Sequence, residues 1–122
     1  MKKAFKNIVK AAEDLDWSVT DAREAGFTVD KGITQLEFEK YSPAGEDFSF
    51  TVESDSPEGL IDEISAYSAD FDKEEHIRMW IGAGEHGTGG VPSIKELVED
   101  ADAIEDMLRE LAEAVNYGVL EK

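Results

Sequence analysis

The stretch TQLEFEKYSPAGEDFSFTVES, residues 34–54, decides the fold. Apolar and polar side chains alternate on both sides of its centre, which is the pattern of two half-buried strands. Between them, a serine at position 42, a proline at 43 and a glycine at 45 favour a type I turn. We therefore predict a β-hairpin with strands at 34–41 and 47–54, whose apolar face needs helices to cover it.

A helix is predicted before the hairpin, over residues 2–15, because apolar residues recur there at spacings of three and four. This stripe consists of Phe5, Ile8, Val9 and Ala12. After it, Trp17 and Val19 alternate like a short strand, and Phe27 and Val29 alternate again. Residues 21–32 show no consistent pattern, so their path stays open.

Three helices are predicted after the hairpin, because three segments begin with helix-capping patterns. The capping pairs are Ser56 with Pro57, Asp72 with Glu75, and Ser93 with Glu96. The last helix is expected to end near Tyr117, because Gly118 follows. Its apolar seam consists of Leu97, Ala101, Ile104, Leu108, Leu111 and Val115. We therefore predict one α+β domain over residues 1–122, with an antiparallel sheet of three or four strands, an amino-terminal helix and three carboxy-terminal helices.

The two tryptophans are expected to differ in position. Trp80 shares a predicted helix face with Ile77 and Ile81, which favours a place in the core. Trp17 follows Asp16, and a place at the rim of the core, where it could contribute a binding hot spot, stays open.

Acidic side chains dominate the second part of the chain. The 122 residues include 29 Asp and Glu against 12 Lys and Arg, which gives a formal net charge of −17. Residues 1–45 hold 8 acids and 7 bases, whereas residues 46–122 hold 21 acids and 5 bases. This balance argues against a broad basic face for DNA, RNA or an anionic membrane.

The predicted last helix carries a dense run of acids outside its apolar seam. They are Glu96, Glu99, Asp100, Asp102, Glu105, Asp106, Glu110 and Glu113. Like charges four residues apart, such as Asp102 and Asp106, each destabilise a helix by roughly 0.2–0.5 kcal/mol. Two explanations stay open: a solvated face of an acidic protein, or a docking surface that attracts a basic partner. Reversal of Asp102 and Asp106 to lysine would distinguish them.

No motif supports catalysis, a metal or a cofactor. The chain has no cysteine, which excludes disulfides, thiolate zinc sites and cysteine nucleophiles. Residues 82–87 spell Gly-x-Gly-x-x-Gly, but they follow a predicted helix and carry Glu85 where a phosphate would approach. His76 and His86 belong to no metal-binding motif. We therefore expect a protein that is not an enzyme, and we interpret the glycine-rich segment as a connector between helices.

Nothing in the sequence indicates export or a membrane. Lys6 and Lys10 interrupt the stretch that would form the apolar core of a signal peptide. No apolar run approaches the roughly 20 residues needed to span a bilayer. We therefore expect a soluble, cytoplasmic protein.

Residues 41–50, YSPAGEDFSF, and residues 90–101, GVPSIKELVEDA, resemble segments of small acidic accessory proteins of bacterial phages, plasmids and conjugative elements. This resemblance covers 22 of the 122 residues and implies a mobile-element setting, in which acidic anti-defence proteins are common and several act as DNA mimics. The leading hypothesis is a protein-binding module whose acidic last helix engages a basic partner surface of the nucleic-acid-binding kind. The alternative is a scaffold protein that self-associates, for example as a homodimer, through the seam of its last helix.

Overall fold

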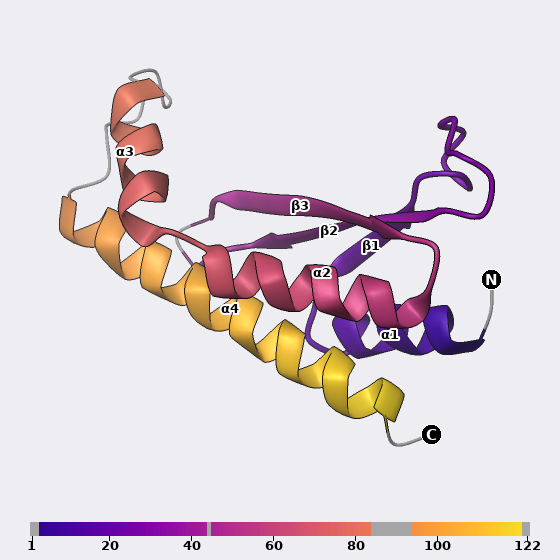
Figure 1. The fold of residues 1–122 in the computed structure, drawn as a ribbon. Coiled ribbons are helices and arrows are strands. Elements are labelled where there is room, and N and C mark those ends of the chain that lie inside the picture. Colours follow the sequence, from indigo (N-terminus) through magenta and orange to yellow (C-terminus); the bar gives the residue numbers. More distant parts are fainter. Residues whose placement is uncertain (1–2, 44, 84–93, 121–122) are drawn as a thin grey trace.

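The computed structural model describes residues 3–43, 45–83 and 94–120, and it has the predicted α+β class (Figure 1). The elements are α1 Lys3–Glu13, β1 Ser18–Asp21, β2 Thr34–Tyr41, β3 Asp47–Ser54, α2 Pro57–Asp70, α3 Lys73–Ala83 and α4 Ile94–Leu120. The strands form an antiparallel sheet in the order β1-β2-β3. Figure 1 shows α1, α2 and α4 on one side of this sheet and α3 at one end of it.

The hairpin β2–β3 confirms the prediction from its sequence, including the bounds of both strands. The two strands pair along their whole lengths, with Phe38 opposite Phe50. At the turn, the backbone N–H of Gly45 donates to the carbonyl of Ser42 at 2.8 Å. Gly45 has a φ of 91°, a left-handed conformation that glycine adopts without steric cost. The inner face of the hairpin consists of Leu36, Phe38, Phe48, Phe50 and Val52, all buried.

The core lies between this inner face and the helices, and it includes Trp17. Only 2% of the Trp17 surface is exposed, and its ring lies edge-on to Phe50 at a centroid distance of 5.8 Å. Trp17 therefore lies in the core and not at its rim. Asp16 adopts a left-handed φ of 71° and stays exposed, so the chain turns and the next side chain points inward. Burial of the large indole ring is a strong stabilising contribution there.

Two of the predicted helix caps are present. At the start of α2, the backbone N–H of Gly59 donates to the Ser56 hydroxyl at 3.0 Å. At the start of α3, the backbone N–H of Glu75 donates to the Asp72 carboxylate at 3.1 Å. Each cap satisfies one of the amide groups that a helix leaves unpaired at its beginning. The third predicted cap, Ser93, lies outside the described residues.

Helix α4 is longer than predicted, because it continues through Gly118 to Leu120. A glycine ends a helix where it turns left-handed, whereas here the helix continues for two residues beyond Gly118. Its seam, from Leu97 to Val115, is buried as expected. In α3, Ile77 is half-buried, whereas the side chains of Trp80 and Ile81 lie outside the described part of the chain, as does His86.

The segment before β2 contains one short strand and a loop. The strand signal at Trp17 and Val19 corresponds to β1, whereas the alternation at Phe27 and Val29 forms no strand, and Phe27 is 69% exposed. The loop is held by Arg23, whose guanidinium donates to the carbonyl of Asp30 at 2.9 Å.

Candidate partner-binding face

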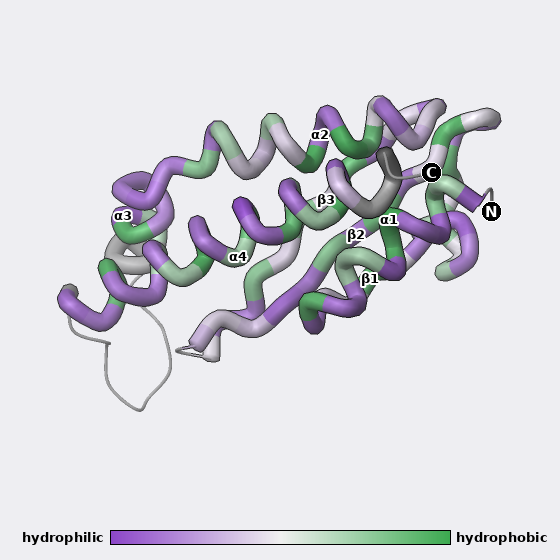
Figure 2. Tube along the Cα trace, turned by 90° about the horizontal axis from the view of Figure 1, so that it is seen from below, coloured by the Kyte–Doolittle hydropathy of each residue, from purple (hydrophilic) through white to green (hydrophobic). Residues whose placement is uncertain are grey.

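The structure places the eight predicted acidic residues of α4 in three environments. Glu105 is half-buried and Asp100 is buried. The exposed ones are Glu96, Glu99, Asp102, Asp106, Glu110 and Glu113. These six together with Glu105 are here called the acidic face. Figure 2, which views the helical side of the molecule from below, shows hydrophilic stretches that repeat along α4 between hydrophobic ones.

Asp100 differs from its predicted place on the acidic face. It is only 7% exposed, and its carboxylate accepts a hydrogen bond from the Ser42 hydroxyl at 2.9 Å. The reason is helical geometry, since Asp100 lies three residues after Leu97 and four before Ile104, both of which are buried. Asp100 therefore joins α4 to the hairpin turn, and it is not part of the exposed acidic face.

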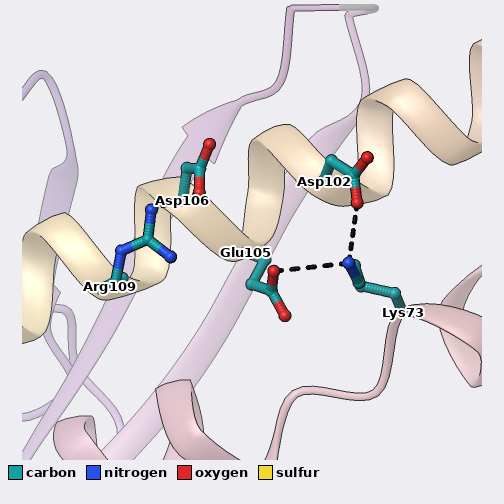
Figure 3. Close-up of polar contacts among 5 residues, drawn as sticks. All are labelled: Lys73, Asp102, Glu105, Asp106 and Arg109. Atoms are coloured by element: carbon teal, nitrogen blue, oxygen red, sulfur yellow. Dashed lines mark hydrogen bonds and ion pairs between the residues drawn. The ribbon is translucent and has the colours of Figure 1, made fainter.

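Lys73 at the start of α3 pairs with two residues of the acidic face. Its ammonium lies 2.9 Å from the Asp102 carboxylate and 3.5 Å from that of Glu105. Figure 3 shows both contacts. The hydrogen bond to Asp102, together with the charges of Asp102 and Glu105, raises the pKa of Lys73. Sequence patterns do not show these contacts, because Lys73 is 29 residues before Asp102 in the chain.

A second base, Arg109, lies on α4 itself and pairs with Asp106. Other carboxylates of the acidic face are not neutralised in this way. Among the described residues, no cation lies within ion-pair distance of Glu99, Glu110 or Glu113. These three carboxylates are therefore the part of the acidic face that is most available to an external cation.

The acidic face has a high average density of charge along the helix axis. Its seven carboxylates extend from Glu96 to Glu113, which at 1.5 Å per residue is about 26 Å of helix, or one carboxylate per roughly 4 Å. One strand of DNA carries a phosphate about every 3.4 Å along the duplex axis. The linear charge density of the face is thus close to that of one DNA strand before Lys73 and Arg109 are taken into account.

A second acidic surface occupies the open side of the sheet. Glu37, Glu39, Asp47 and Glu53 belong to strand positions that alternate with the buried aromatic and aliphatic residues. A hydrogen bond with the Asp47 carboxyl, together with the Asp47 charge, raises the pKa of Glu39. No acid of this surface was among the predicted site residues, although the same period-two pattern that predicts the strands assigns these acids to the outer face.

The apolar seam of α4 is used within the chain itself. Ile104, Leu108, Leu111 and Val115 are fully buried in the core, together with residues of α1 and α2. Self-association through this seam stays a prediction, but a second copy would have to displace these contacts. A surface already exposed by the fold is easier for a partner to reach.

Comparisons with protein families, with curated proteins and with solved structures give no match for this chain. Within residues 3–43, 45–83 and 94–120, no helix is long and apolar enough to cross a bilayer. The same residues contain no group of three or more acidic or histidine side chains placed to hold a metal ion.

Proposed function

We propose that this protein is a non-enzymatic binding module whose acidic face engages a basic partner surface that normally binds nucleic acid. The observation that supports this function is the run of seven carboxylates along α4, six of them exposed, with on average one carboxylate per roughly 4 Å of helix axis. By occupying the phosphate-binding groups of the partner, the module competes with the nucleic acid. The segments that resemble mobile-element proteins are consistent with an anti-defence inhibitor of the DNA-mimic type.

The physical basis of such binding is charge complementarity on a rigid support. Carboxylates accept charge-assisted hydrogen bonds from arginine and lysine, as phosphates do. A surface with one predominant sign of charge also accelerates the encounter with its complement. Because the seam of α4 is buried in the core, the helix backbone that carries the acidic face is ordered before the partner arrives, which reduces the backbone entropy lost on binding.

The variant that tests this proposal reverses Glu99, Glu110 and Glu113 to lysine. These residues have no cationic partner among the described residues, so their reversal breaks no internal ion pair. Reversal of Asp102 and Asp106 is less informative, because it also removes the contacts to Lys73 and Arg109.

A control variant with the same change in net charge reverses Glu13, Asp62 and Glu63, which are exposed on α1 and α2. Each protein is immobilised, exposed to basic nucleic-acid-binding proteins of a bacterial lysate, and washed at low salt and at roughly 0.5 M salt. The Debye length at that salt is below the roughly 10 Å of 0.1 M. Retained proteins are identified and tested for displacement by duplex DNA.

The expected result is a partner that wild type and control retain at low salt, that high salt or duplex DNA releases, and that the acidic-face variant does not retain. Equal retention by the wild type and the acidic-face variant would contradict the proposed function.

A further inference from the structure

A hollow of about 420 Å³ lies where the start of β3, the end of α2 and the first turns of α3 meet. This volume is within the range of ligand pockets, about 300–1,000 Å³. The hollow is separate from the acidic face and plays no part in the binding function proposed above. Its walls combine aromatic rings with carboxylates.

The aromatic wall is built on the hydrophobic core. Tyr67 stacks on Phe50 at a centroid distance of 4.4 Å, and 37% of its surface is still exposed. Phe71 lies edge-on to Phe48 at 6.0 Å and lies 5.5 Å from the His76 ring. These rings are fixed by packing, so they present rigid surfaces. Aromatic faces attract cations, and they attract the planar guanidinium group in particular.

The charged wall is acidic, and none of the described residues that line it is a lysine or arginine. Glu46 lies 3.1 Å from the His76 ring nitrogen, and Asp72 caps α3, so both carboxylates have partners within the fold. In the described part of the chain, by contrast, no cation pairs with the side chain of Asp70 or Glu75.

Helix α2 ends at the hollow, where α3 also begins, so the partial negative charge of the first helix end is offset there by the partial positive charge of the second. The last residue of α2 is Asp70, and the last turn of this helix has no basic residue. The hollow thus has two features that favour a cation: aromatic faces, and the carboxylates of Asp70 and Glu75, which pair with no cation among the described residues.

We propose that this hollow receives an arginine side chain of the basic partner. The inference rests on the proposed function for the identity of that partner. A guanidinium group can stack on Tyr67 or Phe71 while its N–H groups donate to the carboxylates of Asp70 and Glu75. A lysine ammonium pairs with carboxylates as a point charge and has no planar surface to stack.

One partner surface can reach both the hollow and the acidic face, because Lys73 lies between them. Its chain neighbour Asp72 lines the hollow, whereas its ammonium contacts Asp102 and Glu105 of the acidic face. An arginine in the hollow would therefore anchor the partner beside α4.

The test uses short peptides and needs no partner. Acetyl-Gly-Arg-Gly-amide is titrated into the protein while the amide NMR shifts of residues 46–49 and 67–76 are followed. In parallel titrations, lysine or neutral citrulline takes the place of arginine in the same peptide. We expect shifts at the hollow with arginine, weaker binding of lysine and no binding of citrulline. Equal binding of lysine and arginine, or no shifts at the hollow, would overturn the inference.

Two variants separate the acidic and the aromatic contributions. Asp70→Asn with Glu75→Gln keeps the shapes of the side chains and should weaken arginine binding about tenfold, as the loss of two partly exposed ion pairs predicts. The matched control, Asp62→Asn with Glu63→Gln, removes the same charge from an exposed part of α2 and should leave binding unchanged. An equal loss in both variants would show only general electrostatic attraction and would overturn the inference.

Phe71→Leu tests the stacking, because it removes a ring and keeps an apolar side chain. The preference for arginine over lysine should decrease in this variant, with folding checked by thermal unfolding. An undiminished preference for arginine in Phe71→Leu and also in Tyr67→Leu would contradict stacking and overturn the inference.

The peptide assay also separates this inference from the proposed function. If reversal of the acidic face leaves partner retention unchanged while the arginine peptide still binds the hollow, the proposed function fails and the hollow remains an arginine site. If partner retention depends on the acidic face but the hollow shows no shifts, only the inference about the hollow fails.

Discussion

Ser42→Ala should destabilise the protein far more than a substitution in a turn normally does. Ser42 is 5% exposed, and its hydroxyl donates to the Asp100 carboxylate at 2.9 Å. The same oxygen accepts the backbone N–H of Glu46 at 3.0 Å. The substitution therefore removes two hydrogen bonds that join the hairpin turn to α4 and close the turn itself.

The size of the effect follows from the chemistry of these bonds. A hydrogen bond to a charged group contributes about 1.5–3 kcal/mol to stability. We expect Ser42→Ala to lower the free energy of unfolding by about 2 kcal/mol. With a urea m-value near 2 kcal/mol/M, the unfolding midpoint would fall by about 1 M. The melting temperature would fall by roughly 8 °C for a chain of this length.

Urea unfolding followed by circular dichroism measures this change, with Ser49→Ala on the exposed outer face of β3 as the control. Ser49→Ala should change stability by less than about 0.5 kcal/mol. A double-mutant cycle with Asp100→Asn should show that the two substitutions are not additive. If Ser42→Ala costs no more than Ser49→Ala, the assignment of Asp100 to the interior rather than to the binding face is refuted.

Three further predictions concern stability and charge. Trp17→Ala should lower the free energy of unfolding by about 3–5 kcal/mol, because it empties a core position, and a loss below about 1 kcal/mol in urea unfolding would contradict its burial. The pKa of Glu39 is raised by Asp47, so the ionisation of Glu39 destabilises the folded state. Glu39→Gln should therefore be more stable than wild type at pH 7, and this difference in stability should vanish as the pH falls toward the ordinary pKa of 4.5. The pKa of Lys73 is also raised, so the stability that its ion pairs contribute is complete below the ordinary pKa of 10.5 and is lost as the pH rises through the higher pKa of the folded state. Lys73→Met should lack this loss of stability at alkaline pH when unfolding is measured against pH. The same variant should retain a basic partner more strongly in the capture assay.

Much of the backbone was predictable from local sequence. The alternation of residues 34–54 predicted β2 and β3 with their bounds, and Ser56 and Asp72 marked the starts of α2 and α3. These signals are local, because pleat periodicity and capping involve residues only two to four apart. The end of α4 was less predictable, since the helix continues through Gly118 to Leu120.

The candidate site was only partly predictable. The periodicity of α4 correctly predicted six of the eight acids as exposed, but Asp100 at the edge of the seam is buried. A carboxylate at such an edge position is exposed or buried according to what packs beside it. Here the hairpin turn supplies the Ser42 hydroxyl, 58 residues away in the chain. A helical pattern contains no information about that neighbour.

By itself, the sequence determined the hairpin, the order of the helices, the burial of the α4 seam and the excess of acid in the second part of the chain. These properties depend on periodicity, capping and composition. Only the tertiary structure decided that Trp17 lies in the core, that Asp100 leaves the acidic face, that Lys73 neutralises part of that face, and that Tyr67, Phe71 and Asp70 surround one hollow. The reason is physical: each depends on packing between side chains from different elements, which meet only when the helices cover the sheet.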